Sequence, residues 1–328
     1  MNMNIISKQN DNNANKPIVS VILCTYNAES FVQEAIDSIL KQSFKDFELI
    51  IVDDGSSDGT REIIKKYVDS RIKYFPLKVN SGLVFSRNFA IEKSNGEYIA
   101  LMDHDDISHP NRLRDQIDHI KKNDADICSS FHYELNDATK KIKKRKSYTR
   151  NPDIQALLTV YSPITNPSVM MRKKIFNSHS YSKEREMAED YALWCELAKA
   201  GKKFTCCPKF LITYRVHTSQ MSVAGVKNNK TVSDLIKLNY IRDLLGVDYQ
   251  APSKQFFFSR LRVAVPFLKK INQIIPGISI FANYEIYARY QHRGNGLLTP
   301  LIRLERLTIA VLMSLYGLYL SRKLISGK

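Results

Sequence analysis

The chain has 328 residues, of which 44% are hydrophobic, and its formal net charge is +16. This length and composition predict one large folded domain with an extension, or two domains, and they exclude a largely disordered chain. The five cysteines are odd in number and lack metal-site spacing, so we expect reduced, mostly buried thiols.

The first sixteen residues (1–16) are polar and rich in asparagine, which predicts a disordered tail. They do not combine a basic start with an apolar core, as a signal peptide would. We therefore expect the body of the protein to stay in the cytoplasm.

Residues 17–225 alternate between short apolar runs and amphipathic segments, and this rhythm predicts an α/β fold with a mostly parallel sheet and flanking helices. Strands are expected at 19–25, 47–53, 71–75 and 98–102, and helices at 31–40, at 57–68 with Val68 facing inward, and at 81–94. Later elements are expected to form the far wall of a crevice: a helix at 110–122, strands at 126–133 and 166–172, a helix at 189–200, and short strands at 203–207 and 210–216.

Residues 226–328 are mainly helical in pattern, basic, and expected to lie close to a membrane. Positions 251–328 hold twelve basic and two acidic residues beside apolar runs. This arrangement favours an anionic membrane surface over nucleic acid as the partner. Residues 307–320 carry no charge but are too short to span a bilayer easily, which favours an interfacial helix. For residues 307–320, a helix buried in a protein core or dimer contact and a tilted membrane span remain open as alternatives. The separate basic run 140–146 is expected to be a solvated loop.

Carboxylates follow two of the expected strands directly. Asp53 and Asp54 end the strand at 47–53, and residues 103–106 follow the strand at 98–102. Unpaired charge is poor core material, and in open α/β sheets ligands bind beyond the carboxyl ends of the strands. The two clusters predict one site for a cation and a polar, phosphorylated ligand.

The end of the first strand and the turns nearby suit the organic part of such a ligand. Thr25, Tyr26 and Asn27 offer a hydroxyl, an aromatic face and backbone groups to a nucleobase and ribose, and Asp54 can accept a hydrogen bond from a base N–H. Arg87, beside the start of a helix, suits phosphate or ribose; the alternative is a salt bridge to a carboxylate of the crevice.

Asp103 and Asp105 alternate in an extended segment and therefore project to the same side. Oxygen ligands of this kind favour Mg²⁺ or Mn²⁺ over zinc. Glu189 and Asp190 open a helix, where the helix dipole alone would favour acids. His217 follows the last strand beside Arg215, and neither of these two features is specific on its own.

Taken together, these segments resemble glycosyltransferase family 2, the inverting nucleotide-sugar transferases with a GT-A, Rossmann-like fold. The resemblance covers roughly residues 17 to 222 and rests on motifs that occur in the family's order: VSVILCTYNAE, IIVDDGSSDGT, NSGLVFSRN, LMDHDD, NPSVMMR, AEDYALW and YRVH. The C-terminal third does not share the pattern.

The resemblance implies a role for each matching position. The base and ribose of the nucleotide would be held by Thr25, Tyr26, Asn27 and Asp54, and Arg87 would lie near the phosphates. Asp103 would face the ribose and the sugar, Asp106 would lie near the donor sugar, Asp105 would bind the metal, and His217 would approach the metal and the diphosphate. Asp190 would be the catalytic base, and Glu189 would be the fallback base. A divalent Mn²⁺ or Mg²⁺ cofactor is implied.

The implied reaction is one displacement that moves a hexose from a nucleotide sugar, with UDP favoured, to a hydroxyl of a glycan or lipid-diphosphate-linked acceptor. This reaction and the basic C-terminal third together predict an enzyme that associates peripherally with the inner face of the cell membrane. We expect it to act in capsule, O-antigen or exopolysaccharide synthesis. The alternatives are a metal-dependent nucleotidyltransferase, which usually has a basic Gly-rich loop that is missing after residue 25, and a basic nucleic-acid-binding protein, for which no motif is seen.

Overall fold

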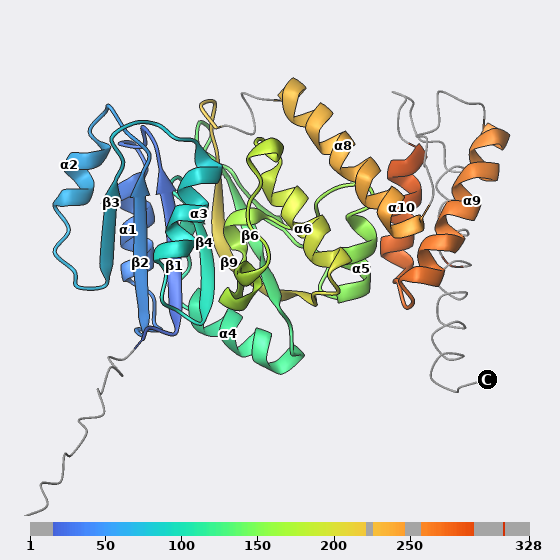
Figure 1. Ribbon diagram of the computed structural model, residues 1–328, viewed down its shortest axis with the longest axis horizontal. Helices are drawn as coiled ribbons and strands as arrows, with labels where there is room; N and C mark the ends of the chain where they lie inside the picture. Colours follow the sequence, from blue (N-terminus) through green and yellow to red (C-terminus); the bar gives the residue numbers. More distant parts are fainter. Residues whose placement is uncertain (1–15, 221–225, 247–256, 292–310, 312–328) are drawn as a thin grey trace, which may run out of the picture.

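The computed structural model describes residues 16–220, 226–246 and 257–291, together with residue 311 (Figure 1). The predicted disordered tail, except residue 16, and the predicted interfacial helix at 307–320, except residue 311, therefore lie outside the described residues.

The N-terminal half of the structure is a parallel sheet with helices on both faces. Its strands pair in the order β3-β2-β1-β4, and all three pairings are parallel. The strands are β1 (Val19–Thr25), β2 (Phe47–Asp53), β3 (Ile72–Pro76) and β4 (Tyr98–Asp103), and the helices between them are α1 (Val32–Leu40), α2 (Thr60–Lys65) and α3 (Leu83–Lys93).

Two packed layers explain why β1 and β2 are continuous apolar runs. Val21 and Leu23 share a buried cluster with Ile36 of α1, whereas Ile22 lies in a second cluster with Ile91 of α3. Successive side chains of a strand point to opposite faces, so a sheet covered on both sides needs apolar residues at nearly every position.

The sheet continues beyond β4 through strands of mixed direction, in the order β4-β8-β6-β9-β5, with β7 paired to β6. Among the described residues, nine strands thus form one sheet. The additional strands are β5 (Ile107–Ser108), β6 (Ile127–Asn136), β7 (Ile142–Arg145), β8 (Met170–Arg172) and β9 (Phe204–Val216), with α4 (Arg112–Asn123), α5 (Asn151–Leu157), α6 (Glu189–Lys199) and short 3₁₀ turns at Asn166–Ser168, Lys173–Asn177 and Lys183–Arg185. The α/β class with a mostly parallel sheet at its N-terminal half is confirmed.

Three helices follow the sheet: α8 (Val226–Leu245), α9 (Phe257–Ile274) and α10 (Ile280–Gln291). Ile236 and Tyr240 of α8 are buried in the same cluster as Trp194 of α6. The helices α9 and α10 share a separate apolar cluster with α5 and lie at the far end of the molecule from α2 and β3 (Figure 1). The helical character predicted after residue 226 is confirmed for the described part, and none of its helices is long and apolar enough to cross a membrane. The division into domains stays a prediction.

The structure corrects two predictions made for the chain after α1. Val68 is fully exposed rather than inward-facing, because α2 ends at Lys65 and the chain leaves the helix there. The basic run contains the exposed strand β7 instead of a loop, although its residues are solvent-facing as expected.

Two strand boundaries also differ from the prediction. The two short strands expected around Pro208 form one strand, β9, whose register against β6 shifts near the proline, which cannot donate a ladder hydrogen bond. Of the strand expected at 166–172, only Met170–Arg172 pair as a strand, because Asn166–Ser168 form a 3₁₀ turn that contains Pro167. The cysteine prediction is confirmed, since all five thiols are free and buried.

Candidate active site

The carboxyl ends of β1, β2 and β4 meet at one edge of the sheet. Thr25 stands opposite Asp53 in the β1–β2 register, and Cys24 stands opposite Asp103 in the β1–β4 register. The chain runs from β1 to one side of the sheet and later returns to the other side at β4, so this edge is a topological switch point. Open α/β sheets bind their ligands at such a point.

The turn after β1 is held by the loop after β2. Asn27 has a positive φ of 46°, a conformation that Asn tolerates better than most residues. Its Oδ1 accepts the Ser57 N–H at 2.9 Å, and its own N–H donates to Ser56 Oγ at 3.0 Å. Tyr26 is 45% exposed and is therefore accessible to a planar ligand, whereas the buried Thr25 hydroxyl has no hydrogen-bond partner in the described structure.

The two adjacent aspartates at the end of β2 have different partners. Asp53 is fully buried and accepts hydrogen bonds from Arg61 Nε at 2.7 Å and the Ser56 N–H at 3.0 Å, which is a structural role. Asp54 accepts the Ser81 N–H at 2.7 Å on Oδ1 and the Gly82 N–H at 2.9 Å on Oδ2. The Asp54 carboxylate thereby fixes the turn that starts α3, and its proposed contact with a base stays a prediction.

Arg87 of α3 bridges the DxD segment and the start of α6. One guanidinium nitrogen donates to Glu189 Oε1, and another donates to Asp103 Oδ1 at 3.3 Å. The ring of Tyr181 lies 5.5 Å from the guanidinium carbon. The salt bridge named above as the alternative is therefore present, and the phosphate contact of Arg87 stays a prediction.

The segment after β4 holds three carboxylates in one place. Asp105 is buried, and its Oδ2 lies 2.9 Å from His217 Nε2, whereas Asp106 accepts the Arg215 N–H at 2.9 Å on Oδ1. Asp106 Oδ2 is buried without a partner in the described structure. Burial raises the pKa of Asp103, with Arg87 opposing and Asp105 reinforcing the effect; burial and then Asp105 raise the pKa of Asp106 well above its ordinary value.

Arg215, which was not among the predicted site residues, organises this segment. Its Nε donates to the Asp105 carbonyl at 2.8 Å, and its terminal nitrogens donate to Asp137 at 2.9 Å and to Glu34. The guanidinium also lies 5.0 Å from the centre of the Phe31 ring. The Tyr-Arg-Val-His run was the available signal, but the partners come from distant elements that the sequence does not connect.

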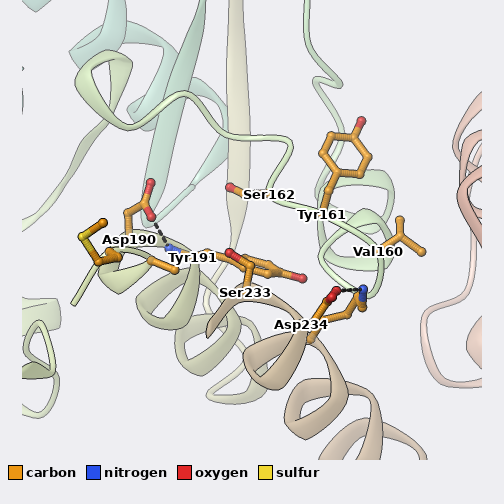
Figure 2. Close-up of a pocket in the computed structure, with 10 residues that line it drawn as sticks. Val160, Tyr161, Ser162, Asp190, Tyr191, Ser233 and Asp234 are labelled. Carbon is orange, nitrogen blue, oxygen red and sulfur yellow. Dashed lines mark hydrogen bonds and ion pairs between the residues drawn. The ribbon is translucent and has the colours of Figure 1, made fainter. Parts of the chain in front are cut away.

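The two acids in the first turn of α6, Glu189 and Asp190, have different partners. Glu189 is buried and accepts a hydrogen bond from Arg87. Asp190 accepts the Tyr191 N–H at 2.6 Å on Oδ1, while Oδ2 has no hydrogen-bond partner among the described residues, and the side chain lines a pocket (Figure 2). Burial, reinforced by the Glu189 charge, raises the pKa of Asp190 to about 6. Asp190 therefore has the free oxygen and the raised proton affinity of a general base.

The residues present fit a divalent ion that is also held by a substrate. Within the described ranges, no group of three or more His, Cys, Asp or Glu side chains is arranged to hold a metal. Asp105 and His217 supply one carboxylate and one imidazole in contact. Mg²⁺ and its relatives are commonly bound through one or two protein ligands plus substrate phosphates, and imidazole is compatible with transition metals.

Comparisons with known proteins identify the family of the chain. Residues 20–182 match the model of the family described as Glycosyl transferase family 2. An uncharacterised glycosyltransferase of Haemophilus influenzae is 32% identical over 250 residues, covering 71% of this chain and 77% of that protein.

Two solved structures share the fold. The crystal structure of S. aureus TarS 1-349 in complex with UDP-GlcNAc has a TM-score of 0.54 at 19% identity and covers 89% of this chain and 90% of its own. The mannosyltransferase PcManGT from Pyrobaculum calidifontis, in complex with GDP-Man and Mn²⁺, has a TM-score of 0.53 at 15% identity and covers 93% of this chain and 89% of its own.

A mixed α/β sheet with carboxylates at its switch point is the architecture of the GT-A class. The chain belongs to glycosyltransferase family 2 and is a glycosyltransferase. The family resemblance seen in the sequence motifs is thereby confirmed.

Proposed function

We propose that this enzyme transfers a hexose, with inversion, from a UDP-sugar to a hydroxyl of a glycan or lipid-linked acceptor in a reaction that needs Mn²⁺ or Mg²⁺. The single observation that carries the proposal is the meeting of Asp103, Asp105 and His217 beside Asp190, joined through Arg87 and Glu189. The solved structures with UDP-GlcNAc and with GDP-Man and Mn²⁺ support the nucleotide-sugar donor and the metal.

The donor side of the reaction uses the carboxylates at the end of β4. Asp105 and His217 would hold the divalent ion together with the donor's phosphates. Bound there, the ion supplies Lewis-acid stabilisation of the negative charge on the departing nucleoside diphosphate. Tyr26 is exposed at the same edge, where its ring can stack on the base.

The acceptor side of the reaction uses Asp190. Its Oδ2 takes the proton of the acceptor hydroxyl while the acceptor oxygen bonds to the anomeric carbon. The bond from that carbon to the diphosphate oxygen breaks, and its electron pair leaves with the nucleoside diphosphate. Because the attack comes from the opposite face, an α-linked donor gives a β-linked product without a covalent enzyme intermediate. Glu189, paired with Arg87, orients this turn of α6 and is the fallback base.

Titration calorimetry tests the donor proposal. UDP is titrated into the full chain with and without Mn²⁺, beside an Asp105→Ala variant and a His179→Ala variant whose histidine lies outside the site. We expect tight UDP binding only when both Mn²⁺ and Asp105 are present, with weak binding remaining in the absence of the metal. Absence of binding by UDP, dTDP and GDP in every condition would contradict the proposal.

We further propose that the enzyme works peripherally on the cytoplasmic side of the cell membrane, in the synthesis of a surface polysaccharide. The support is the +10 charge of residues 251–328 beside apolar runs. The full chain should sediment with phosphatidylglycerol vesicles at low salt and not with phosphatidylcholine vesicles. Equal recovery with both, or with neither, would refute this location.

A further inference from the structure

A pocket of about 300 Å³ opens beside Asp190, between the first turn of α6, the loop after α5 and the N-terminal half of α8 (Figure 2). This volume is at the lower end of the range for small-molecule sites. The polar side chains that line it come from three separate segments and include Tyr161, Ser162, Asp190, Ser233, Asp234 and Lys237.

The α8 wall of this pocket is held firmly against α6. Ile236 and Tyr240 are buried in the core cluster around Trp194, and Lys199 of α6 forms an ion pair of 2.8 Å with Asp243 of α8. The helix α8 therefore contributes side chains to a space that Asp190 borders.

We infer that this pocket binds the reacting sugar unit of the acceptor, as an uncharged ring, and that Ser233 and Asp234 of α8 determine which sugar fits. The inference rests on the proposed function, because it takes Asp190 as the base. A general base must lie within hydrogen-bond reach of the proton it removes. Asp190 lines the pocket, and no described residue occupies its Oδ2, so a sugar bound in the pocket can bring a hydroxyl to this carboxylate.

The charges around the pocket favour a neutral ligand over a phosphate. Asp190 and Asp234 are both acidic, and the one basic side chain of the lining, Lys237, donates to Asp234 Oδ1 at 2.6 Å. A phosphate would meet two carboxylates and an ammonium group that is already paired. A sugar instead donates its hydroxyl protons to carboxylates and serine oxygens and lays an apolar ring face on an aromatic side chain such as Tyr161.

The pocket thereby holds only one part of the acceptor. Its terminal sugar unit occupies the space between α6 and α8, and any diphosphate and lipid of a membrane-held acceptor stay outside. In Figure 2, Asp234 lies on the opposite side of the pocket from Asp190, and Ser233 lies between them, so Asp234 contacts the part of the ring farthest from the reacting hydroxyl.

Ligand-observed saturation-transfer NMR on the full chain tests this assignment. The probes are the methyl glycosides of glucose, galactose and N-acetylglucosamine, with glucose 1-phosphate as the anionic comparison. The variants are Ser233→Tyr, which fills the pocket, and Asp234→Asn, which removes one charged acceptor. Asp243→Asn is the matched control, because Asp243 also lies on α8 and is also paired with a lysine, Lys199 of α6, but does not line the pocket.

We expect at least one methyl glycoside to bind the wild-type chain more tightly than glucose 1-phosphate. Asp234→Asn should weaken that binding about tenfold, as expected for loss of a charged hydrogen bond, and Ser233→Tyr should abolish it. Asp243→Asn should leave it unchanged.

Three results would overturn the assignment: unchanged glycoside binding in Ser233→Tyr and Asp234→Asn, preference for glucose 1-phosphate, or no glycoside binding by a wild-type chain that binds UDP. UDP titration of the same samples separates the two proposals. A wild-type chain that binds glycosides in this pocket but no nucleotide would contradict the donor proposal alone.

Discussion

Asp105 Oδ2 and His217 Nε2 lie 2.9 Å apart, although 112 positions separate these residues in the chain. Asp105 follows β4, and His217 follows β9, which pairs with β5 just beyond Asp105. The short β5–β9 pairing therefore brings the imidazole to the carboxylate. The Phe31 ring packs against His217 in a tilted arrangement, with ring centres 4.7 Å apart, and helps to hold the imidazole there.

This relationship predicts that the metal and the nucleotide bind as one unit. Replacing His217 with alanine should weaken UDP binding in the presence of Mn²⁺ about tenfold, because one ligand of the shared ion is lost. Binding of UDP without metal should change little. Calorimetry with and without Mn²⁺ measures both, and equal losses in the two conditions would assign His217 a packing role instead.

Replacing Asp190 with asparagine should lower the rate of sugar transfer about 10²–10⁴-fold, because the acceptor hydroxyl loses its base. The Kd for UDP should not change, since Asp190 lies on the acceptor side. Initial-rate measurements of UDP release test this, with Glu196→Gln as the control because Glu196 is an exposed acid on the same helix. A transfer rate within about threefold of wild type would exclude Asp190 as the base.

The raised pKa of Asp190 predicts the pH dependence of the reaction. A carboxylate with a pKa of about 6 is protonated below that pH and unable to accept a proton. The value of kcat/KM should therefore fall about tenfold per pH unit below 6 and level off above it. The residual activity of Asp190→Asn should lack this acidic limb, and an unchanged limb in the variant would assign it to another group.

Arg87 and Glu189 form a buried pair whose side chains are 7% and 10% exposed. Arg87→Met should lower the free energy of unfolding by about 3–5 kcal/mol, because the Glu189 charge stays buried without its partner. The double variant with Glu189→Gln should recover much of this loss. Urea unfolding measures the difference, and Lys93→Met on the same helix, paired in the open with Glu92, should cost less than about 1 kcal/mol. Equal costs for Arg87→Met and the double variant would show that the pair is not coupled.

Gly55 lies at a positive φ of 79°, and a Cβ there would come within 2.7 Å of the backbone at Val79 and Asn80. Gly55→Ala should therefore cost about 2–5 kcal/mol, from backbone strain plus the steric clash. Gly201→Ala separates the two effects, because Gly201 has a φ of 70° with nothing within 4 Å, and should cost about 1–2 kcal/mol. Similar melting temperatures for the two variants would show that the 79–80 loop yields to the added methyl group.

Local patterns in the sequence were sufficient for the fold class and for the acidic ends of the strands. The hydrophobic periodicities of strands (2) and helices (3.6) are visible within a short stretch of sequence. The elements β1, β2 and α1 and the carboxylates after β2 and β4 could therefore be predicted. The end of α2 before the exposed Val68 and the continuous strand through Pro208 could not be predicted in this way. The position of a helix end or a strand bulge depends on the contacts and hydrogen bonds that neighbouring elements offer.

The sequence alone was thus enough to predict which residues would carry the chemistry: the carboxylates, the histidine and the paired acids of the first turn of α6. Only the tertiary structure decided their partners. Arg87 joins Glu189 to Asp103, Arg215 fixes the backbone at Asp105, and α8 closes a pocket beside Asp190. These contacts link elements far apart in the chain, and their distances are set by the sheet order and helix packing, which no short segment of sequence encodes.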